Sequence, residues 1–105
     1  MVDTEQSRAR EVGAPLGAAI LSDYRQLFGR VQCVSIAVPT RFHFQVARDF
    51  IEAGVDVLVE KPLTADIAEA RALVAAAKAK NVILQVGHLE RVNPPIRQLE
   101  GVIKD

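Results

Sequence analysis

The stretch CVSIAVPTRFHFQVARDFIEAGVDVLVEKP, residues 33–62, decides the fold. It begins with a short, β-branched apolar run at 33–38 and closes with another at 55–59. Such continuous runs are typical of strands covered on both faces of a parallel sheet. Between the runs, from Phe42 to Ala53, apolar residues recur at intervals of three and four, which predicts a helix that Gly54 ends. The stretch therefore predicts a strand, a helix and a second strand.

The same alternation continues toward the C-terminus. Apolar residues recur at helical spacing from Ala65 to Lys80, with Thr64 as the expected N-cap and Asn81 as the residue that closes the helix. A third strand-like run follows at 82–86, so strand and crossover helix are repeated. The predicted fold class is α/β, an open parallel sheet with helices on both faces.

Shorter elements are expected on both sides of this block. Residues 5–12 predict a short helix that ends at Gly13, 18–21 a short strand, and 22–28 another short helix capped by Ser22. Pro94 and Pro95 mark the start of a last helix that runs to about Lys104.

The composition describes one small globular domain. The chain has 105 residues, 50% of them hydrophobic, and its 13 Lys+Arg balance 13 Asp+Glu. A neutral balance without a basic run disfavours a nucleic-acid partner, and the apolar runs are too short to cross a membrane. The polar, acidic start favours the cytoplasm, and the one cysteine, Cys33, is expected to be a core residue because it lies in an apolar run.

Chemistry-bearing side chains follow the ends of all three predicted strands. They are His43 after the first, Glu60 and Lys61 directly after the second, and His88 after the third. Ligands of open parallel sheets bind beyond the carboxyl ends of the strands, so these side chains are expected at one edge. Plainer interpretations stay open: a helix-capping or core role for His43, a solvated lysine at Lys61, and a backbone-anchoring loop residue at His88. The two histidines are 45 positions apart without paired cysteines, which disfavours a metal site.

Three motifs in this order carry a resemblance. They are Val38-Pro39-Thr40 followed by His43, then Val59-Glu60-Lys61-Pro62-Leu63, and then Gln85-Val86-Gly87-His88 with Arg91, Asn93 and Pro94. From about Val2 to Pro95 the chain resembles the Gfo/Idh/MocA family of nicotinamide-dependent sugar oxidoreductases. The last motif looks most like members that act on nucleotide sugars. The resemblance implies a Rossmann domain that binds NAD or NADP, in an enzyme that moves hydride to or from a sugar carbon.

The resemblance also implies roles for the matching residues. Val38, Pro39 and Thr40 would line the cofactor, His43 would lie beside it, Glu60 would lie near the nicotinamide ribose, and Gly87 and His88 would close the site. Lys61 would be the catalytic residue, because its ammonium could stabilise the developing alkoxide or relay the proton. Pro62 would hold Lys61 in place through a bond that is commonly cis in relatives. Arg91 and Asn93 would lead toward the substrate.

Two parts of the family pattern are missing from the sequence. A GxGxxG turn, which seats the pyrophosphate, does not occur in the 105 residues, and the C-terminal substrate domain is missing as well. Val2-Asp3 resembles the end of the family's second strand. Residues 1–105 are therefore expected to form a partial dinucleotide-binding domain, from that strand to the start of the link to the substrate domain. Asp3 would accept a hydrogen bond from a ribose 2′-hydroxyl, which slightly favours NAD over NADP.

Two hypotheses for the function follow. In the first, the chain is part of an oxidoreductase that acts on a sugar or nucleotide-sugar hydroxyl, and it is inactive alone because the reacting carbon is not positioned. In the second, it is a non-enzymatic remnant or a self-associating module. In the usual strand order 3-2-1-4-5-6, loss of strand 1 leaves one edge of residues 33–38 unpaired, which predicts a homo-oligomer through that edge.

Overall fold

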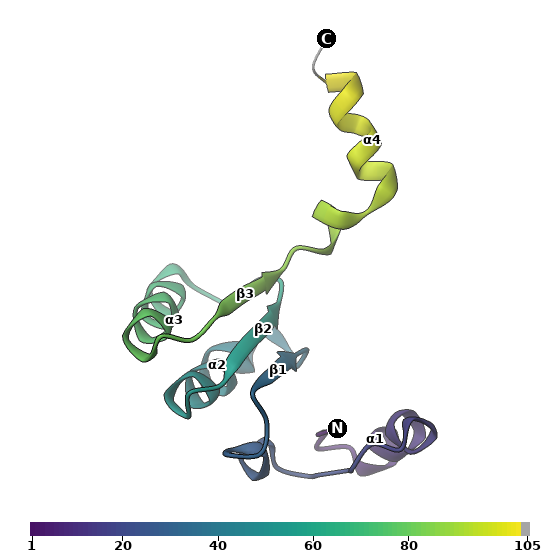
Figure 1. Cartoon of the computed structure of the whole chain (residues 1–105), viewed down its shortest axis with the longest axis vertical. Helices are drawn as coiled ribbons and strands as arrows, with labels where there is room; N and C mark the ends of the chain where they lie inside the picture. The colour runs from purple at the N-terminus through teal and green to yellow at the C-terminus, as the bar shows by residue number, and fades with distance from the viewer. Residues whose placement is uncertain (104–105) are drawn as a thin grey trace. The chain divides into compact units, whose positions relative to one another are not determined.

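The computed structural model describes residues 1–103 and divides the chain into two compact units (Figure 1). The first unit comprises residues 1–32, and the second begins at Cys33. The expected end of the last helix near Lys104 lies outside the described residues.

The second unit contains a three-stranded parallel sheet. Its strands are β1 (Cys33–Ile36), β2 (Asp56–Glu60) and β3 (Leu84–Gly87), in the order β1-β2-β3. The chain returns between them through the helices α2 (His43–Glu52) and α3 (Ile67–Lys80). Short 3₁₀ turns, η3 (Thr40–Phe42) and η4 (Leu89–Val92), follow β1 and β3, and α4 (Pro94–Ile103) comes last. The predicted open α/β sheet with parallel strands is confirmed.

Alternation along the strands shows which face of the sheet carries the core. Ile36, Val57 and Val59 are buried and point to the same face, because Ile36 pairs with Val59 in the parallel register. Facing them on the helices are the buried residues Phe50 and Ile51 of α2 and Leu73 and Ala77 of α3. Each fully buried aliphatic side chain contributes roughly 1.5–3 kcal/mol, so this layer is the main source of stability in the unit.

Both crossover helices lie on this one face of the sheet. α2 packs against α3 and against β2, and Figure 1 shows the two helices on one side of the strands. Successive right-handed crossovers that proceed in one direction across a sheet place their helices on the same side. Within residues 33–103, helices α2 and α3 thus cover the same face of the sheet. The sequence also predicted helices on the second face, and these two helices do not lie there.

The other face of the sheet exposes side chains that the sequence pattern assigned to the interior. Cys33, Ser35, Leu58 and Gln85 alternate with the core residues, and all four are exposed. The expectation that Cys33 is a core residue is therefore wrong. It lies at the first position of β1 and on the face away from α2, so its place in an apolar run did not determine its burial.

The caps of α3 differ in part from the expectation. Asp66, rather than Thr64, is the N-cap, and its carboxylate accepts a hydrogen bond of 2.9 Å from the backbone N–H of Glu69. Asn81 closes the helix in the left-handed conformation at φ 54°, as predicted. Asp56 links the start of β2 to the start of β3, because its carboxylate accepts a hydrogen bond of 2.8 Å from the N–H of Ile83 just before β3.

The first unit contains one helix and several short turns. α1 spans Gln6–Gly13, and 3₁₀ turns follow at Ala14–Leu16 and Tyr24–Leu27. The strand expected at 18–21 is reduced to a parallel bridge between Val2 and Leu21, which fits the interpretation of Val2 as the end of a strand. The helix expected at 22–28 is a single 3₁₀ turn, capped by Asp23 instead of Ser22, because the Asp23 carboxylate reaches the N–H of Arg25 at 2.9 Å.

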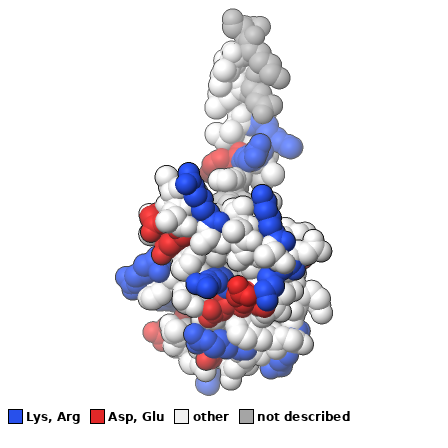
Figure 2. Space-filling view, turned by 90° about the vertical axis from the view of Figure 1, so that its left-hand side faces the viewer, with Lys and Arg blue, Asp and Glu red and all other residues white. Residues whose placement is uncertain are grey.

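The surface carries charges of both signs. Figure 2 shows Lys and Arg interspersed with Asp and Glu over the face that it presents. Among residues 1–103, every helix is too short or too polar to span a lipid bilayer. The same residues contain no group of three or more His, Cys, Asp or Glu side chains arranged to hold a metal ion.

Candidate functional site

The three loops that follow the strands leave the sheet at one edge. The strands are parallel and in register, with Ile36 beside Val59 and Glu60 beside Gly87, so their carboxyl ends lie next to one another. The arrowheads in Figure 1 point the same way for this reason. The motifs that the sequence singled out after β1, β2 and β3 therefore start from neighbouring positions.

His43 joins the first two of these loops. It is the first residue of α2 and only 1% exposed. Its Nε2 lies 2.7 Å from the carbonyl oxygen of Val38, in the loop after β1, and its Nδ1 lies 2.8 Å from the carbonyl oxygen of Pro62, in the loop after β2. The interpretation of His43 as a buried residue is confirmed, and its polar atoms hold the backbone of both loops.

Lys61 and Pro62 form the turn between β2 and α3. The peptide bond between them is cis, as the resemblance implied. Both side chains are exposed, whereas Thr64 two residues further on is buried and donates from Oγ1 to the carbonyl of Asp66 at 2.7 Å. The Lys61 ammonium therefore emerges beyond a buried strand at a turn that is fixed by the contacts of Pro62 and Thr64.

Glu60 and Gly87 meet across the last register position of β2 and β3. A Cβ atom on Gly87 would lie 3.1 Å from Oε1 of Glu60 and 3.3 Å from its carboxyl carbon. The other carboxylate oxygen, Oε2, accepts from the N–H of Lys61 at 3.2 Å. The absence of a side chain at residue 87 thus lets the carboxylate lie against β3.

The structure brings some of the predicted site residues together and leaves others apart. Val38, His43 and Pro62 form one hydrogen-bonded group. Glu60 accepts from the N–H of Lys61, and its carboxylate lies against Gly87. Asn93 instead donates from its side-chain amide to Glu90 at 2.9 Å, within the turn η4. Arg91 and His88 are exposed in the same segment. Asp3 belongs to the first unit, where its Oδ1 accepts from the N–H of Glu5 at 2.8 Å.

Sequence reasoning missed two contributions to this edge. Thr64 is not the helix cap that the sequence predicts, because its hydroxyl closes the turn after Lys61-Pro62. The requirement for glycine at position 87 comes from Glu60, which lies 27 residues earlier in the sequence. The apolar run at 55–59, followed directly by the charged residues Glu60 and Lys61, is the sequence signal that could have indicated the second contact.

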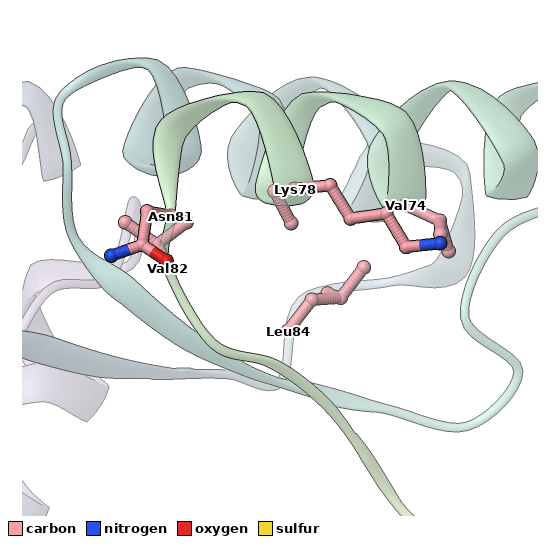
Figure 3. A pocket seen from close by; sticks show the side chains of 6 residues that line it. Val74, Lys78, Asn81, Val82 and Leu84 are labelled. Carbon is pink, nitrogen blue, oxygen red and sulfur yellow. The ribbon is translucent and has the colours of Figure 1, made fainter.

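A shallow concavity lies elsewhere, along α3 and the start of β3. Its volume is about 390 Å³, and Figure 3 shows Leu84 pointing toward Val74 and Lys78 of the helix. Asn81 and Val82 complete its end. These residues lie on α3, in the loop after it or at the first position of β3, whereas the site motifs follow the carboxyl ends of the strands, so the concavity is separate from the candidate site.

The comparison with protein families assigns the chain. Residues 1–88 match the family model described as an oxidoreductase family with an NAD-binding Rossmann fold, which is the Gfo/Idh/MocA family. The chain belongs to the Gfo/Idh/MocA family. The match includes β1, β2 and β3 with the first two motifs and the third as far as His88, so the inferred family resemblance is confirmed.

Among the relatives, a UDP-N-acetylglucosamine 3-dehydrogenase from Acidithiobacillus ferrooxidans is 41% identical over 97 residues, which cover 92% of this chain and 31% of the relative. Its solved structure superposes with a TM-score of 0.86, covering 96% of this chain and 33% of that one. This Gfo/Idh/MocA chain therefore spans about a third of the length of the relatives that it matches.

Two further solved structures contain a nicotinamide cofactor. An inositol dehydrogenase homologue from Azotobacter vinelandii, complexed with NAD+, is 34% identical and superposes with a TM-score of 0.81. The alignment covers 98% of this chain and 29% of the homologue. A 3-ketoreductase from Actinomadura kijaniata, in complex with TDP-benzene and NADP, is 27% identical with a TM-score of 0.88, and 98% of this chain covers 33% of it. Both cofactors thus occur among the relatives of this Gfo/Idh/MocA chain.

Proposed function

We propose that residues 1–105 are a partial dinucleotide-binding domain that supplies the nicotinamide side of the site in an oxidoreductase acting on a sugar or nucleotide-sugar hydroxyl. The observation that carries this proposal is the position of Lys61. Its ammonium-bearing side chain emerges beyond the end of β2, next to the Glu60 carboxylate and on a turn that His43 ties to the neighbouring loop. The relative that acts on UDP-N-acetylglucosamine supports a nucleotide sugar as the substrate class.

The residues at this edge fit the nicotinamide half of a dinucleotide. Val38 is 37% exposed and Pro39 is exposed beside it, so both offer apolar surface to a flat ring. Thr40 follows them in η3, the Glu60 carboxylate can accept from ribose hydroxyls, and Gly87 and His88 border the same edge. The pyrophosphate has no glycine-rich turn to bind in these 105 residues. We therefore propose weak binding of NAD or NADP by the chain alone.

The chemistry assigned to this edge depends on Lys61. A nicotinamide cofactor bound at this edge would supply the acceptor for the hydride that leaves the carbinol carbon of the sugar. As the hydroxyl proton leaves, negative charge develops on oxygen, and a nearby ammonium stabilises that charge or relays the proton. Glu60 and Pro62 orient Lys61 for this role, and Arg91 and Asn93 are assigned to the substrate side.

Cofactor choice and location belong to the same proposal. Asp3 uses Oδ1 to hold the start of α1, and its second oxygen would accept from the ribose 2′-hydroxyl, which slightly favours NAD over NADP. The cytoplasm, expected from the sequence, stays the proposed location.

A second candidate function rests on β1. Among the described residues, no strand pairs with its second edge, and such an edge can pair with another copy. We propose self-association through β1 as the alternative, in which the chain is a homo-oligomeric, non-enzymatic module.

A chimera tests the enzymatic proposal. In this chimera, the chain replaces the matching third of the Acidithiobacillus ferrooxidans dehydrogenase, while that enzyme's own N-terminal segment is kept. NAD+ reduction is then assayed with UDP-N-acetylglucosamine as the substrate. We expect turnover by the chimera and a loss of roughly 100- to 1000-fold in kcat for its Lys61→Ala variant, as for other groups that stabilise an oxyanion. A folded, active chimera whose Lys61→Ala variant keeps full kcat would refute the role of Lys61.

A further inference from the structure

We infer that His43 is a positioning residue that fixes the loop after β1 to the loop after β2, and that it thereby sets the position of Lys61. The link itself follows from the structure of the second unit. Only its consequence for cofactor binding rests on the proposed function.

The two contacts of the ring connect distant parts of the sequence. Val38 is five residues before His43 and Pro62 is 19 residues after it, and each contributes its carbonyl oxygen at 2.7 and 2.8 Å. Both distances lie at the short end of the range for N–H···O hydrogen bonds. Because the two nitrogens belong to one rigid ring, the two loops keep a fixed separation as long as both contacts are made.

These contacts exclude helix capping as the role of His43. A capping side chain accepts from backbone N–H groups in the first turn of its own helix. The ring of His43 instead faces two carbonyl oxygens outside α2, and no side-chain cap hydrogen bond is present at the start of this helix. A neutral imidazole donates one hydrogen bond and an imidazolium two, so the ring donates to at least one of the two loops.

An apolar core role does not account for the ring either. At 1% exposure its nitrogens cannot turn to water, and a buried polar atom without a partner lowers the stability of the fold. Each ring nitrogen therefore lies within hydrogen-bond distance of a carbonyl oxygen, and the ring donates to one of the two carbonyls when neutral and to both when protonated. Breaking the link frees Pro62, and with it Lys61, whose own N–H donates to Glu60 over a long 3.2 Å contact.

The experiment compares two variants of the full chain by amide proton-nitrogen NMR. His43→Phe keeps a ring in the core and removes both hydrogen bonds. Val46→Ala removes buried volume one turn further along α2, leaves the ring of His43 in place, and serves as the control for lost stability. The reporters are the amides of Val38, Thr40, Lys61 and Leu63 in the loops, and those of Leu73 and Ala77 in the core.

We expect His43→Phe to shift and broaden the four loop amides while the two core amides keep their positions. NADH affinity falls about tenfold or more in the same variant. Val46→Ala lowers the melting temperature but leaves the loop amides and NADH affinity unchanged. Loop amides that are equally unaffected in both variants would overturn the inference.

Two further observations keep the outcome decisive. If His43→Phe fails to fold, the ring N–H of His43 in the unaltered chain decides, since a buried hydrogen-bonded imidazole proton exchanges slowly whereas that of exposed His88 exchanges rapidly. A His43 ring proton that exchanges as fast as that of His88 contradicts the link. If the unaltered chain does not bind NADH, the proposed function fails, and the loop amides still test the link.

Discussion

The carboxylate of Glu60 lies in the space where a side chain at residue 87 would begin. The 3.1 Å between Oε1 and an ideal Cβ on Gly87 is closer than carbon and oxygen normally approach, so the two positions depend on each other. Glu60 ends β2 and Gly87 ends β3, at paired positions of the register. The contact therefore couples the Glu-Lys-Pro motif to the Gly-His motif.

Gly87→Ala is expected to displace the Glu60 carboxylate while the sheet stays folded. The atom that must move is the end of a flexible side chain, so the loss of stability should be below about 1 kcal/mol. Chemical denaturation measures this loss, and NADH titration measures the accompanying fall in affinity. Gly101→Ala is the control, because among the described residues its new Cβ would meet nothing within 4 Å beyond its chain neighbours and the backbone of its own helix, and alanine favours the helix α4. A Gly87→Ala variant with unchanged NADH affinity would contradict the coupling.

Asp56→Ala is expected to loosen the start of β3. The carboxylate of Asp56 accepts from the N–H of Ile83 at 2.8 Å, and its loss should cost about 1 kcal/mol because water can reach the exposed Ile83. Urea denaturation gives the change in stability, and amide exchange at Ile83 should accelerate. Glu11→Ala, at an exposed position of α1, should change neither quantity. Equal effects of the two variants would speak against the role of Asp56.

Adjacent residues of α3 should differ sharply in their contribution to stability. Leu73 is fully buried and Val74 is 43% exposed. Leu73→Ala should cost about 2–5 kcal/mol, since it removes buried volume from the layer between helix and sheet. Val74→Ala should cost under about 1 kcal/mol. Thermal denaturation of both variants checks the assignment of the core face, and a reversed ranking would place the wrong face of α3 against α2.

Self-association tests the second candidate function. If the free edge of β1 pairs with another copy, light scattering after size-exclusion chromatography should give a mass above 11.4 kDa that rises with concentration. Ser35→Lys, at an exposed position of β1, should shift the population toward monomer, because charges on an edge strand oppose pairing. A monomer at millimolar concentration would exclude this alternative.

The sequence predicted the parallel sheet because strand runs and helical spacing alternate, and that order forces crossovers. It misjudged Cys33 because the apolar run at 33–38 does not show which face of a strand lacks a helix. It also assigned the N-cap of α3 to Thr64. The N-cap is Asp66, because its carboxylate accepts a hydrogen bond from the N–H of Glu69. Local patterns cannot distinguish two candidate caps that are two residues apart.

The candidate site was predictable as a set of positions, but not as a set of contacts. The sequence alone predicted that His43, Lys61 and His88 lie at one edge of the sheet, because each of them follows the end of a parallel strand. The hydrogen bonds of His43 to Val38 and Pro62, and the approach of Glu60 to Gly87, depend on the register of neighbouring strands. Periodicity in one segment does not determine this register.

Titration of the chain with NADH, followed by amide proton-nitrogen NMR, tests the central claim most directly. If the chain supplies the nicotinamide side of a dinucleotide site, the shifts concentrate at Val38, Thr40, His43, Glu60, Lys61, Gly87 and His88, and reduced nicotinamide mononucleotide reproduces them while AMP does not. A well-dispersed spectrum in which these amides do not move at millimolar NADH would contradict the claim.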